Sequence, residues 1–377
     1  MNAGANCELR EALRAARMIW RLPLWPTQDR LIWERAVAGS GPEGLDNPAY
    51  GWRPRTIRKN EDAYGQYLSW LYREGLLNES KAVSERVTSE LLNGYTAKLK
   101  SYLAPVSVAA AVGGLASAAN ALAPCSDWSF LSRRSSRLRL RAKPSRDKRH
   151  AIRHTLDLYN YGKELMETED RGKGRTTSAA YRYQAGLVIA LLAARPLRIR
   201  NFQAITIGKS LRWDGVHYWL TFGTEETKTR RPINEPLPND LRPYLERFLQ
   251  IWRPVLLKRA HKYGCHAASR RLWINLAGPM KESSLRAMIK RYTQRKFGTE
   301  IWPHLFRDCL LTSVAVDQPE LVRISASLLG HANSRTGGKH YNQARMLDAS
   351  RRYGDAISEL RESFFDTEAA QRQGSKA

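Results

Sequence analysis

WPHLFRDCLLTSVAV, at residues 302–316, is the stretch that most constrains the fold of this chain. Pro303 stands where a helix would begin, and a proline in the first turn loses no helical hydrogen bond. Apolar side chains recur every four residues and predict a buried stripe at Phe306, Leu310 and Val314. His304 and Arg307 are three residues apart, so they share another face of this helix. By spacing alone, such a pair is more often an ordinary surface pair than a functional one.

A second informative stretch is LLGHANSRTGGKHYNQA, residues 328–344. It places His331 directly behind a glycine that can end a helix, and Tyr341 follows on a polar, glycine-bearing segment. Gly337 and Gly338 are each about 1 kcal/mol less favourable in a helix than alanine, so we expect this segment to be mobile. A tyrosine by itself would usually be a half-buried packing residue.

Two further basic residues are candidates with an ordinary explanation of their own. Arg198, in RPLRIRN, sits where an apolar helix gives way to a loop, and its neighbours Arg195 and Arg200 make it ambiguous by spacing. Basic residues at a helix C-terminus also interact favourably with the helix dipole. Lys228, in TEETKTRRP, falls at a predicted strand edge or hairpin tip, where a lysine usually serves solubility.

The charge of the chain indicates a polyanionic partner. Of 377 residues, 62 are Lys or Arg and 36 are Asp or Glu, which leaves a formal net charge of +26. Nucleic acid fits better than an anionic membrane, because no stretch approaches the roughly 20 apolar residues of a membrane span. The longest small-apolar run, residues 104–124, is alanine-rich and partly polar, so we interpret it as a packed helix or helix pair.

The cysteines indicate neither a zinc site nor a disulfide framework. They are widely separated and form no CxxC pair: Cys7, Cys125, Cys265 and Cys309. This pattern fits a reducing cytoplasm. Residues 1–20 mix acidic and basic residues and lack an apolar core, which is not typical of a secretory signal.

Composition divides the chain into segments. Turn residues mark an N-terminal extension at 1–57, and apolar and aromatic residues at three- and four-residue steps predict a helical unit at 58–133. Basic residues dominate 134–150, which we interpret as a linker that is either solvated or in contact with phosphates. A larger unit that includes a C-terminal helix follows at 151–377.

The larger unit is predicted to combine helices with a small sheet. Residues 177–194 form an apolar, buried helix, and β-like runs with an Asp214–Gly215 turn occupy 210–238. Further helices are predicted at 240–259, 282–297, 303–315, 318–329 and 346–364. The predicted fold class is therefore mainly α with a small antiparallel β-sheet, an α+β arrangement.

Six candidate residues stand in a definite order: Arg198, Lys228, His304, Arg307, His331 and Tyr341. With HLFRD, LLGH and a downstream tyrosine in this order, the chain resembles the tyrosine recombinase, or phage-type integrase, family over about 58–360. The helical unit matches only by size and helicity, whereas the larger unit matches by motif. Two positions depart from the family pattern, since Asn201 stands where an acidic residue is frequent and Asp308 where a histidine is frequent.

The resemblance implies a helical core DNA-binding domain at 58–133 and a catalytic domain at 151–377. The implied activity is that of a site-specific recombinase or integrase, which cleaves and rejoins DNA through a covalent 3′-phosphotyrosine and a free 5′-hydroxyl. Double-stranded DNA would be the partner, with self-assembly to a tetramer on DNA and no membrane. The protein would be cytoplasmic, and associated with the nucleoid when bound to DNA.

The six residue types suit this chemistry. A phenol with a pKa near 10 is only about 0.1% ionised at pH 7, so Tyr341 as the nucleophile needs an electropositive site. Arg198 and Arg307 would clamp the phosphorane oxygens, and Lys228 would protonate the leaving oxygen. Imidazole can accept or donate a proton near neutrality. His304 would accept or shuttle the tyrosine proton, and His331 would donate a hydrogen bond to the scissile phosphate.

No cofactor is expected for this reaction. The phosphodiester is exchanged for another ester, so no ATP is needed, and arginine and lysine neutralise the charge, so no metal is needed. The sequence contains no GxxxxGK[ST] phosphate loop and no HExxH motif.

Two alternatives stay open. A topoisomerase IB-like enzyme would use the same tyrosine to relax one duplex, and a catalytically silent DNA-binding protein of the same fold would lack one of the six groups. The helix predicted at 346–364 favours recombination, because members of the family often pass such a segment to a neighbouring protomer. Its apolar residues would serve equally for packing within the chain.

Overall fold

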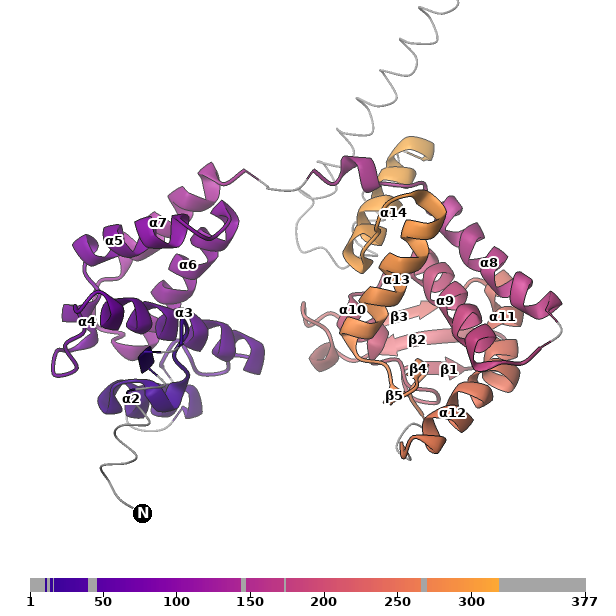
Figure 1. The fold of residues 1–377 in the computed structure, drawn as a ribbon, viewed down its shortest axis with the longest axis horizontal. Helices are drawn as coiled ribbons and strands as arrows, with labels where there is room; N and C mark the ends of the chain where they lie inside the picture. The colour runs from indigo at the N-terminus through magenta and orange to yellow at the C-terminus, as the bar shows by residue number, and fades with distance from the viewer. Residues whose placement is uncertain are drawn as a thin grey trace, which may run out of the picture. The chain divides into compact units, whose positions relative to one another are not determined.

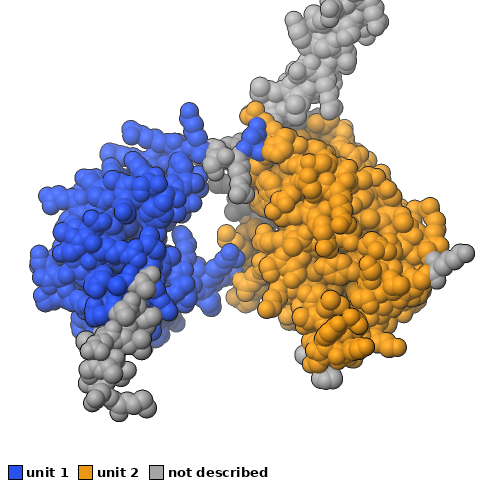
Figure 2. All heavy atoms as spheres, viewed as in Figure 1, with its two compact units in different colours: residues 1–147 blue, residues 148–377 orange. Residues whose placement is uncertain are grey.

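The computed structural model describes most of the chain: residues 11, 14–15, 17–39, 46–143, 147–172, 174–265 and 270–318. The chain divides into two compact units, unit 1 at 1–147 and unit 2 at 148–377 (Figure 2). The boundary falls inside the predicted linker at 134–150. His331, Tyr341 and the helix predicted at 346–364 lie outside the described residues.

The described part of unit 1 consists of helices (Figure 1). After a 3₁₀ turn at Leu22–Leu24 these are α2 (Thr27–Ala38), α3 (Pro54–Arg73), α4 (Val83–Arg86), α5 (Ser89–Lys100), α6 (Pro105–Leu122) and α7 (Ser129–Arg141). Pro54 and Pro105 open α3 and α6, where a missing N–H costs no helical hydrogen bond. Thr88 caps α5 by accepting a hydrogen bond from the Leu91 N–H.

Tryptophans from the N-terminal segment complete the core of unit 1. Trp20, Trp25 and Trp33 are buried, and the rings of Trp25 and Tyr64 lie 4.8 Å apart. The Trp20 backbone N–H donates to the carbonyl oxygen of Gly65 on α3, and a Cβ at Gly65 would lie 2.0 Å from the Trp20 carbonyl oxygen. Part of the segment predicted as a separate extension at 1–57 therefore belongs to this core.

Helix α7 occupies part of the predicted linker at 134–150. Leu131 and Ser135 are buried in this helix, and the Ser135 hydroxyl donates a hydrogen bond of 3.0 Å to the Ala109 carbonyl oxygen of α6. Packing against α6 thus holds the basic segment as a helix as far as Arg141, which charge composition alone does not reveal.

By length and composition, α6 is the one described helix that could cross a membrane, with a mean hydropathy of 1.4. In unit 1 it packs against α3 and α7, and half of its residues are buried. Its apolar character therefore serves packing within this unit.

Unit 2 is built around a buried central helix (Figure 1). The α-helices in its described part are α8 (Thr155–Arg171), α9 (Thr177–Ala194), α10 (Ile199–Gln203), α11 (Arg242–Arg247), α12 (Arg253–Lys262), α13 (Glu282–Phe297) and α14 (Pro303–Asp317). Helix α9 is buried over most of its length, as predicted for 177–194. It meets α8 at two glycines, because a Cβ at Gly186 would lie 2.5 Å from the Gly162 carbonyl oxygen.

The small antiparallel sheet lies within the predicted 210–238. Its strands are β1 (Leu211–Trp213), β2 (Tyr218–Phe222) and β3 (Ile233–Pro236), in the order β1-β2-β3. Leu211 pairs with Leu220, and Leu220 pairs in turn with Glu235. Gly215 has a positive φ of 102° in the β1–β2 turn. A second two-stranded sheet, β4 (Ile274–Asn275) with β5 (Gly278–Pro279), was not predicted. The α+β class predicted from the sequence is confirmed.

The helix predicted at 240–259 is interrupted. Between α11 and α12 lies a π-helical turn at Phe248–Trp252. Pro254 stands in the first turn of α12 and has no N–H to continue the regular hydrogen-bond pattern. The chain therefore rearranges its hydrogen bonds just before this proline.

Candidate active site

Helix α14 and the loop that follows α9 form the centre of the candidate site. Arg307 is buried, with 5% of its surface exposed, and its Nη1 donates a hydrogen bond of 2.9 Å to the Pro196 carbonyl oxygen. Arg198 follows two residues after Pro196, as the N-cap residue of α10. The hydrogen bond therefore brings two segments that are far apart in sequence to the same place.

The buried face of α14 differs from the predicted stripe. Phe306 is fully buried, but Leu310 and Val314 are only half-buried. Arg307, which the spacing placed on a surface face, is buried instead. The predicted stripe is therefore fully buried only at Phe306, and the face of α14 that packs against α9 and α8 includes Leu305, Cys309 and Leu311 instead.

Arg198 acts electrostatically on Arg307. Burial and then the positive charge of Arg198 lower the pKa of Arg307, Asp308 and Glu235 oppose the shift, and the resulting pKa is about 10. Burial also lowers the pKa of Arg198, which is half-buried. Both guanidinium groups remain charged at pH 7, so the protein maintains two neighbouring cations where hydration is reduced. An arrangement of this kind favours binding of an anion.

The structure distinguishes Arg198 from its basic neighbours. The Nε of Arg195 donates to the Pro236 carbonyl oxygen at 3.1 Å and lies 3.6 Å from Glu235, so this side chain ties the end of α9 to β3. Arg200 is exposed on α10. Of the three arginines, Arg198 is the one whose charge acts on both Arg307 and His304.

His304 lies on the solvent side of the same helix. Although the residue is exposed, partial desolvation by surrounding protein lowers the pKa of its imidazole. Asp308, four residues along the helix, raises this pKa, whereas Lys148, Arg307 and Arg198 lower it. The imidazole is therefore mainly neutral at pH 7 and able to accept a proton.

Two carboxylates at the site were not among the predicted site residues. Glu235 on β3 is half-buried, and burial raises its pKa while Arg195 and Arg307 lower it. Asp308 lies 3.8 Å from the Nζ of Lys148. In the sequence, Glu235 lies within a proline-bounded strand and belongs to no recognisable motif. Its place at the site becomes apparent only from the folded structure, in which β3 pairs with β2.

Lys228 lies in the loop between β2 and β3, as predicted, and is exposed. Within the described part of the chain, no residue forms a hydrogen bond or ion pair with it. The same loop is tied to α10, because the Asn201 side-chain N–H donates to the Glu226 carbonyl oxygen at 3.0 Å. Asn201, at the position where an acidic residue was expected from the resemblance, thus anchors the loop that carries Lys228.

Four of the six predicted residues can therefore be located. Arg198, His304 and Arg307 share one electrostatic neighbourhood, and Lys228 stands on a loop that is hydrogen-bonded to the helix capped by Arg198. His331 and Tyr341 lie outside the described residues. Two neighbouring guanidinium groups and a neutral imidazole can bind a phosphate diester and move a proton beside it.

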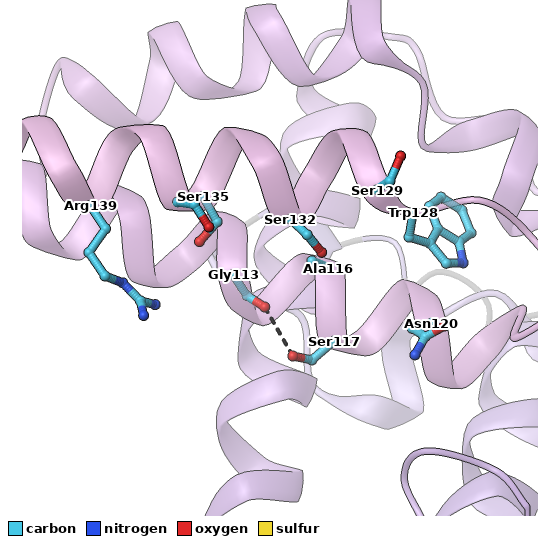
Figure 3. Close-up of a pocket in the computed structure, with 10 residues that line it drawn as sticks. Gly113, Ala116, Ser117, Asn120, Trp128, Ser129, Ser132, Ser135 and Arg139 are labelled. Carbon is cyan, nitrogen blue, oxygen red and sulfur yellow. Dashed lines mark hydrogen bonds between the residues drawn. The ribbon is translucent and has the colours of Figure 1, made fainter. Parts of the chain in front are cut away.

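A separate polar pocket lies in unit 1, between α6 and α7 (Figure 3). Its volume is about 490 Å³, and its lining residues are Gly113, Ala116, Ser117, Asn120, Trp128, Ser129, Ser132, Ser135, Ser136 and Arg139. The Ser117 hydroxyl donates a hydrogen bond of 3.1 Å to the Gly113 carbonyl oxygen of its own helix. None of the predicted site residues lines this pocket.

Comparison with known proteins gives limited similarity. No protein-family model matches the chain, and no curated protein matches it. Among solved structures, the chain is similar to lambda integrase residues 75–356, determined as a dimer bound to a COC′ core site. The sequence identity is 15%, the match covers 78% of this chain and 90% of that chain, and the TM-score is 0.46. A similarity of this size establishes neither the family nor the activity of this protein.

Proposed function

We propose that this protein is a site-specific DNA recombinase or integrase that cleaves and rejoins DNA strands through a covalent 3′-phosphotyrosine formed by Tyr341. The observation that carries the proposal is the pair formed by Arg198 and Arg307, with Arg307 buried against the Pro196 carbonyl oxygen. Burial and the neighbouring charge of Arg198 both disfavour the charged form of Arg307, and Asp308 and Glu235 offset this only in part. A phosphate diester in this place would offset that repulsion.

The remaining groups receive roles that follow from their positions. Lys228, on an exposed loop, would reach the leaving 5′ oxygen and protonate it. His304, neutral at pH 7, would accept or shuttle the proton of Tyr341. His331 would donate a hydrogen bond to the same phosphate. The roles of His331 and Tyr341, which lie outside the described residues, rest on the order of motifs in the sequence.

Unit 1 would hold double-stranded DNA. Helix α7 carries exposed arginines and no acidic residue: Arg133, Arg137, Arg139 and Arg141. Together with the net charge of +26, this surface suits contact with the phosphate backbone. We further propose assembly to a tetramer on DNA in the cytoplasm, since recombination of two duplexes requires four strand cleavages.

The decisive experiment traps the covalent intermediate. The full chain is mixed with a pool of duplexes of random sequence, each nicked so that the short 3′ fragment is lost after cleavage and religation cannot occur. Adducts are collected under denaturing conditions, and their DNA is sequenced, which also identifies the preferred site. We expect an adduct in the presence of a metal chelator and without ATP.

The test variant is Tyr341→Phe, and its control is Tyr353→Phe, which removes the next tyrosine along the sequence. Tyr341→Phe should form no adduct, whereas Tyr353→Phe should form as much as wild type. Equal adduct formation by Tyr341→Phe would overturn the assignment of the nucleophile. If the protein formed the adduct and relaxed supercoiled DNA but never exchanged strands, the topoisomerase-like alternative would be favoured. Tight DNA binding without any adduct would favour a catalytically silent DNA-binding protein.

A further inference from the structure

The first residues of unit 2 lie along α14. The Arg153 backbone N–H donates to the Cys309 Sγ at 3.4 Å, and the Thr155 backbone N–H donates to the Ser313 hydroxyl at 2.9 Å. The His154 Nε2 and the Asp317 Oδ2 are 2.7 Å apart. The three partners on α14 follow at four-residue steps, so residues 153–155 track one face of the helix that carries His304 and Arg307.

The histidine in this segment has a defined tautomer. The His154 Nδ1 accepts a hydrogen bond of 3.3 Å from the Leu156 N–H and thereby caps α8. The ring proton is therefore on Nε2, which donates to Asp317. One side chain thus joins the start of α8 to the end of α14, and the segment before it is held close to the candidate site.

Lys148 opens this segment. Its Nζ lies 3.8 Å from the Asp308 Oδ2, and its side chain is 48% exposed, whereas that of Asp308 is 14% exposed. The distance exceeds that of a direct hydrogen bond, so the ammonium group keeps water around it and is able to turn to a second anion. Because the lysine end of this pair is solvated and makes no close contact with the carboxylate, little opposes such a turn.

We propose that Lys148 is a further phosphate-binding residue of the candidate active site, held beside Arg198 and Arg307 by the docking of residues 153–155 on α14. Its position is independent of any motif, because it rests on the contact with Asp308 and on the hydrogen bonds to α14. When a phosphate diester enters, the ammonium exchanges Asp308 for a non-bridging oxygen. The charge of Lys148 also acts on His304, which agrees with a place at this site.

This proposal rests on the proposed function only in taking DNA as the source of the phosphate. It is therefore tested by binding, with cleavage abolished by Tyr341→Phe in every protein used. The probe is a fluorescein-labelled DNA duplex, and the dissociation constant is measured by anisotropy over a series of sodium chloride concentrations. The variants are Lys148→Gln, Lys148→Arg and the control Lys163→Gln. Lys163 is also ion-paired with an aspartate, Asp240, at 3.3 Å.

Loss of one phosphate contact should reduce the slope of log Kd against log salt by about 0.9. Lys148→Gln should show this reduction and bind about three- to five-fold more weakly. Lys148→Arg should retain most of the affinity, and Lys163→Gln should match the parent protein. An unchanged slope and affinity in Lys148→Gln would overturn the proposal.

A double-mutant cycle places the contact at the site. If Lys148 and Arg198 bind the same phosphate, Lys148→Gln combined with Arg198→Gln should lose clearly less affinity than the product of the single losses. Strictly multiplicative losses would show that Lys148 contacts another phosphate and would overturn its place in the site. None of these binding measurements requires cleavage. If the wild-type protein bound DNA but formed no covalent adduct, the proposed function would be refuted and this inference would still stand.

Discussion

Arg307 and Pro196 are joined by a hydrogen bond of 2.9 Å between the guanidinium Nη1 and the carbonyl oxygen, across 111 residues of sequence. The bond holds α14 against the loop that leads to Arg198. It therefore links the helix that carries Arg307 to the segment that carries Arg198.

Replacing Arg307 by lysine should reduce covalent adduct formation by about 100-fold. Lysine keeps the charge but lacks the planar fork that contacts two phosphate oxygens at once, and groups that stabilise developing charge contribute roughly this much. The rate is measured in a single turnover on a nicked substrate, with Arg200→Lys, an exposed arginine on α10, as the control. Retention of near-normal rates by Arg307→Lys would refute a clamping role.

The imidazole of His304 should titrate below its ordinary pKa of 6.5. Burial lowers the pKa first, and Lys148, Arg307 and Arg198 lower it further, whereas Asp308 raises it. Asp308→Asn should therefore move the midpoint to lower pH, as followed by NMR of the imidazole resonances, and Asp240→Asn should not. A midpoint above 6.5 in the wild type would contradict this electrostatic description.

The same shift predicts how stability depends on pH. The pKa of this histidine is lower in the folded chain than in the unfolded chain. At pH values near these two pKa values, the folded chain therefore binds fewer protons than the unfolded chain. The contribution of His304 to the free energy of unfolding should thus be present above pH 6.5 and be lost as pH falls below it. Urea denaturation of wild type and His304→Gln at several pH values measures it, and a His304→Gln variant with the same pH dependence as wild type would argue against it.

Neutralising α7 should weaken DNA binding and its salt dependence. Replacing Arg133, Arg137, Arg139 and Arg141 by glutamine preserves helix propensity and removes up to four phosphate contacts. On α3, Arg55→Gln with Arg58→Gln serves as the control, because Arg58 lies near Glu61 and Asp62 of its own helix. Anisotropy against salt concentration compares the two, and an equal loss per arginine would show that α7 has no special role.

The buried ion pair of unit 1 should be sensitive to removal of one partner. Asp29 and Arg86 are 2% and 3% exposed and form an ion pair, and the Tyr64 hydroxyl donates to Asp29 at 2.8 Å. Asp29→Ala leaves a buried guanidinium without its carboxylate, so the free energy of unfolding should fall by about 3 to 5 kcal/mol.

Hydrogen exchange of the amides at Tyr64 and Tyr67 in the full chain measures the opening of this region. Asp29→Leu combined with Arg86→Met should recover most of the loss, because apolar side chains of similar size need no partner. An Asp29→Ala variant with exchange rates equal to those of wild type would contradict the expected contribution.

Local signals in the sequence predicted much of unit 2. The helix predicted at 282–297 is α13, and that predicted at 303–315 begins at the same proline as α14. The strands were marked by alternating residues around the Asp214–Gly215 turn. Such features depend on residues a few positions apart, so a sequence pattern is sufficient to predict them.

Contacts between distant segments were not predictable in the same way. The extension predicted at 1–57 contributes Trp20 and Trp25 to the core of unit 1, and the linker predicted at 134–150 is helical up to Arg141. In the candidate site, neither Glu235 nor Lys148 was singled out, because their charged neighbours are distant in sequence: Arg195 and Arg307 for Glu235, and Asp308 for Lys148. Periodicity carries no information on such pairs.

By itself, the sequence determined the α+β class, the net charge that favours nucleic acid and the order of six residue types suited to phosphate chemistry. Only the tertiary structure decided that Arg307 is buried, that Arg198 rather than Arg195 acts on it, and that Lys148 lies beside Asp308. The physical reason is the distance along the chain over which each interaction acts. Helix and turn formation depend on backbone geometry within a few residues, whereas burial and the field at a charged group depend on whatever the folded chain brings within several ångströms.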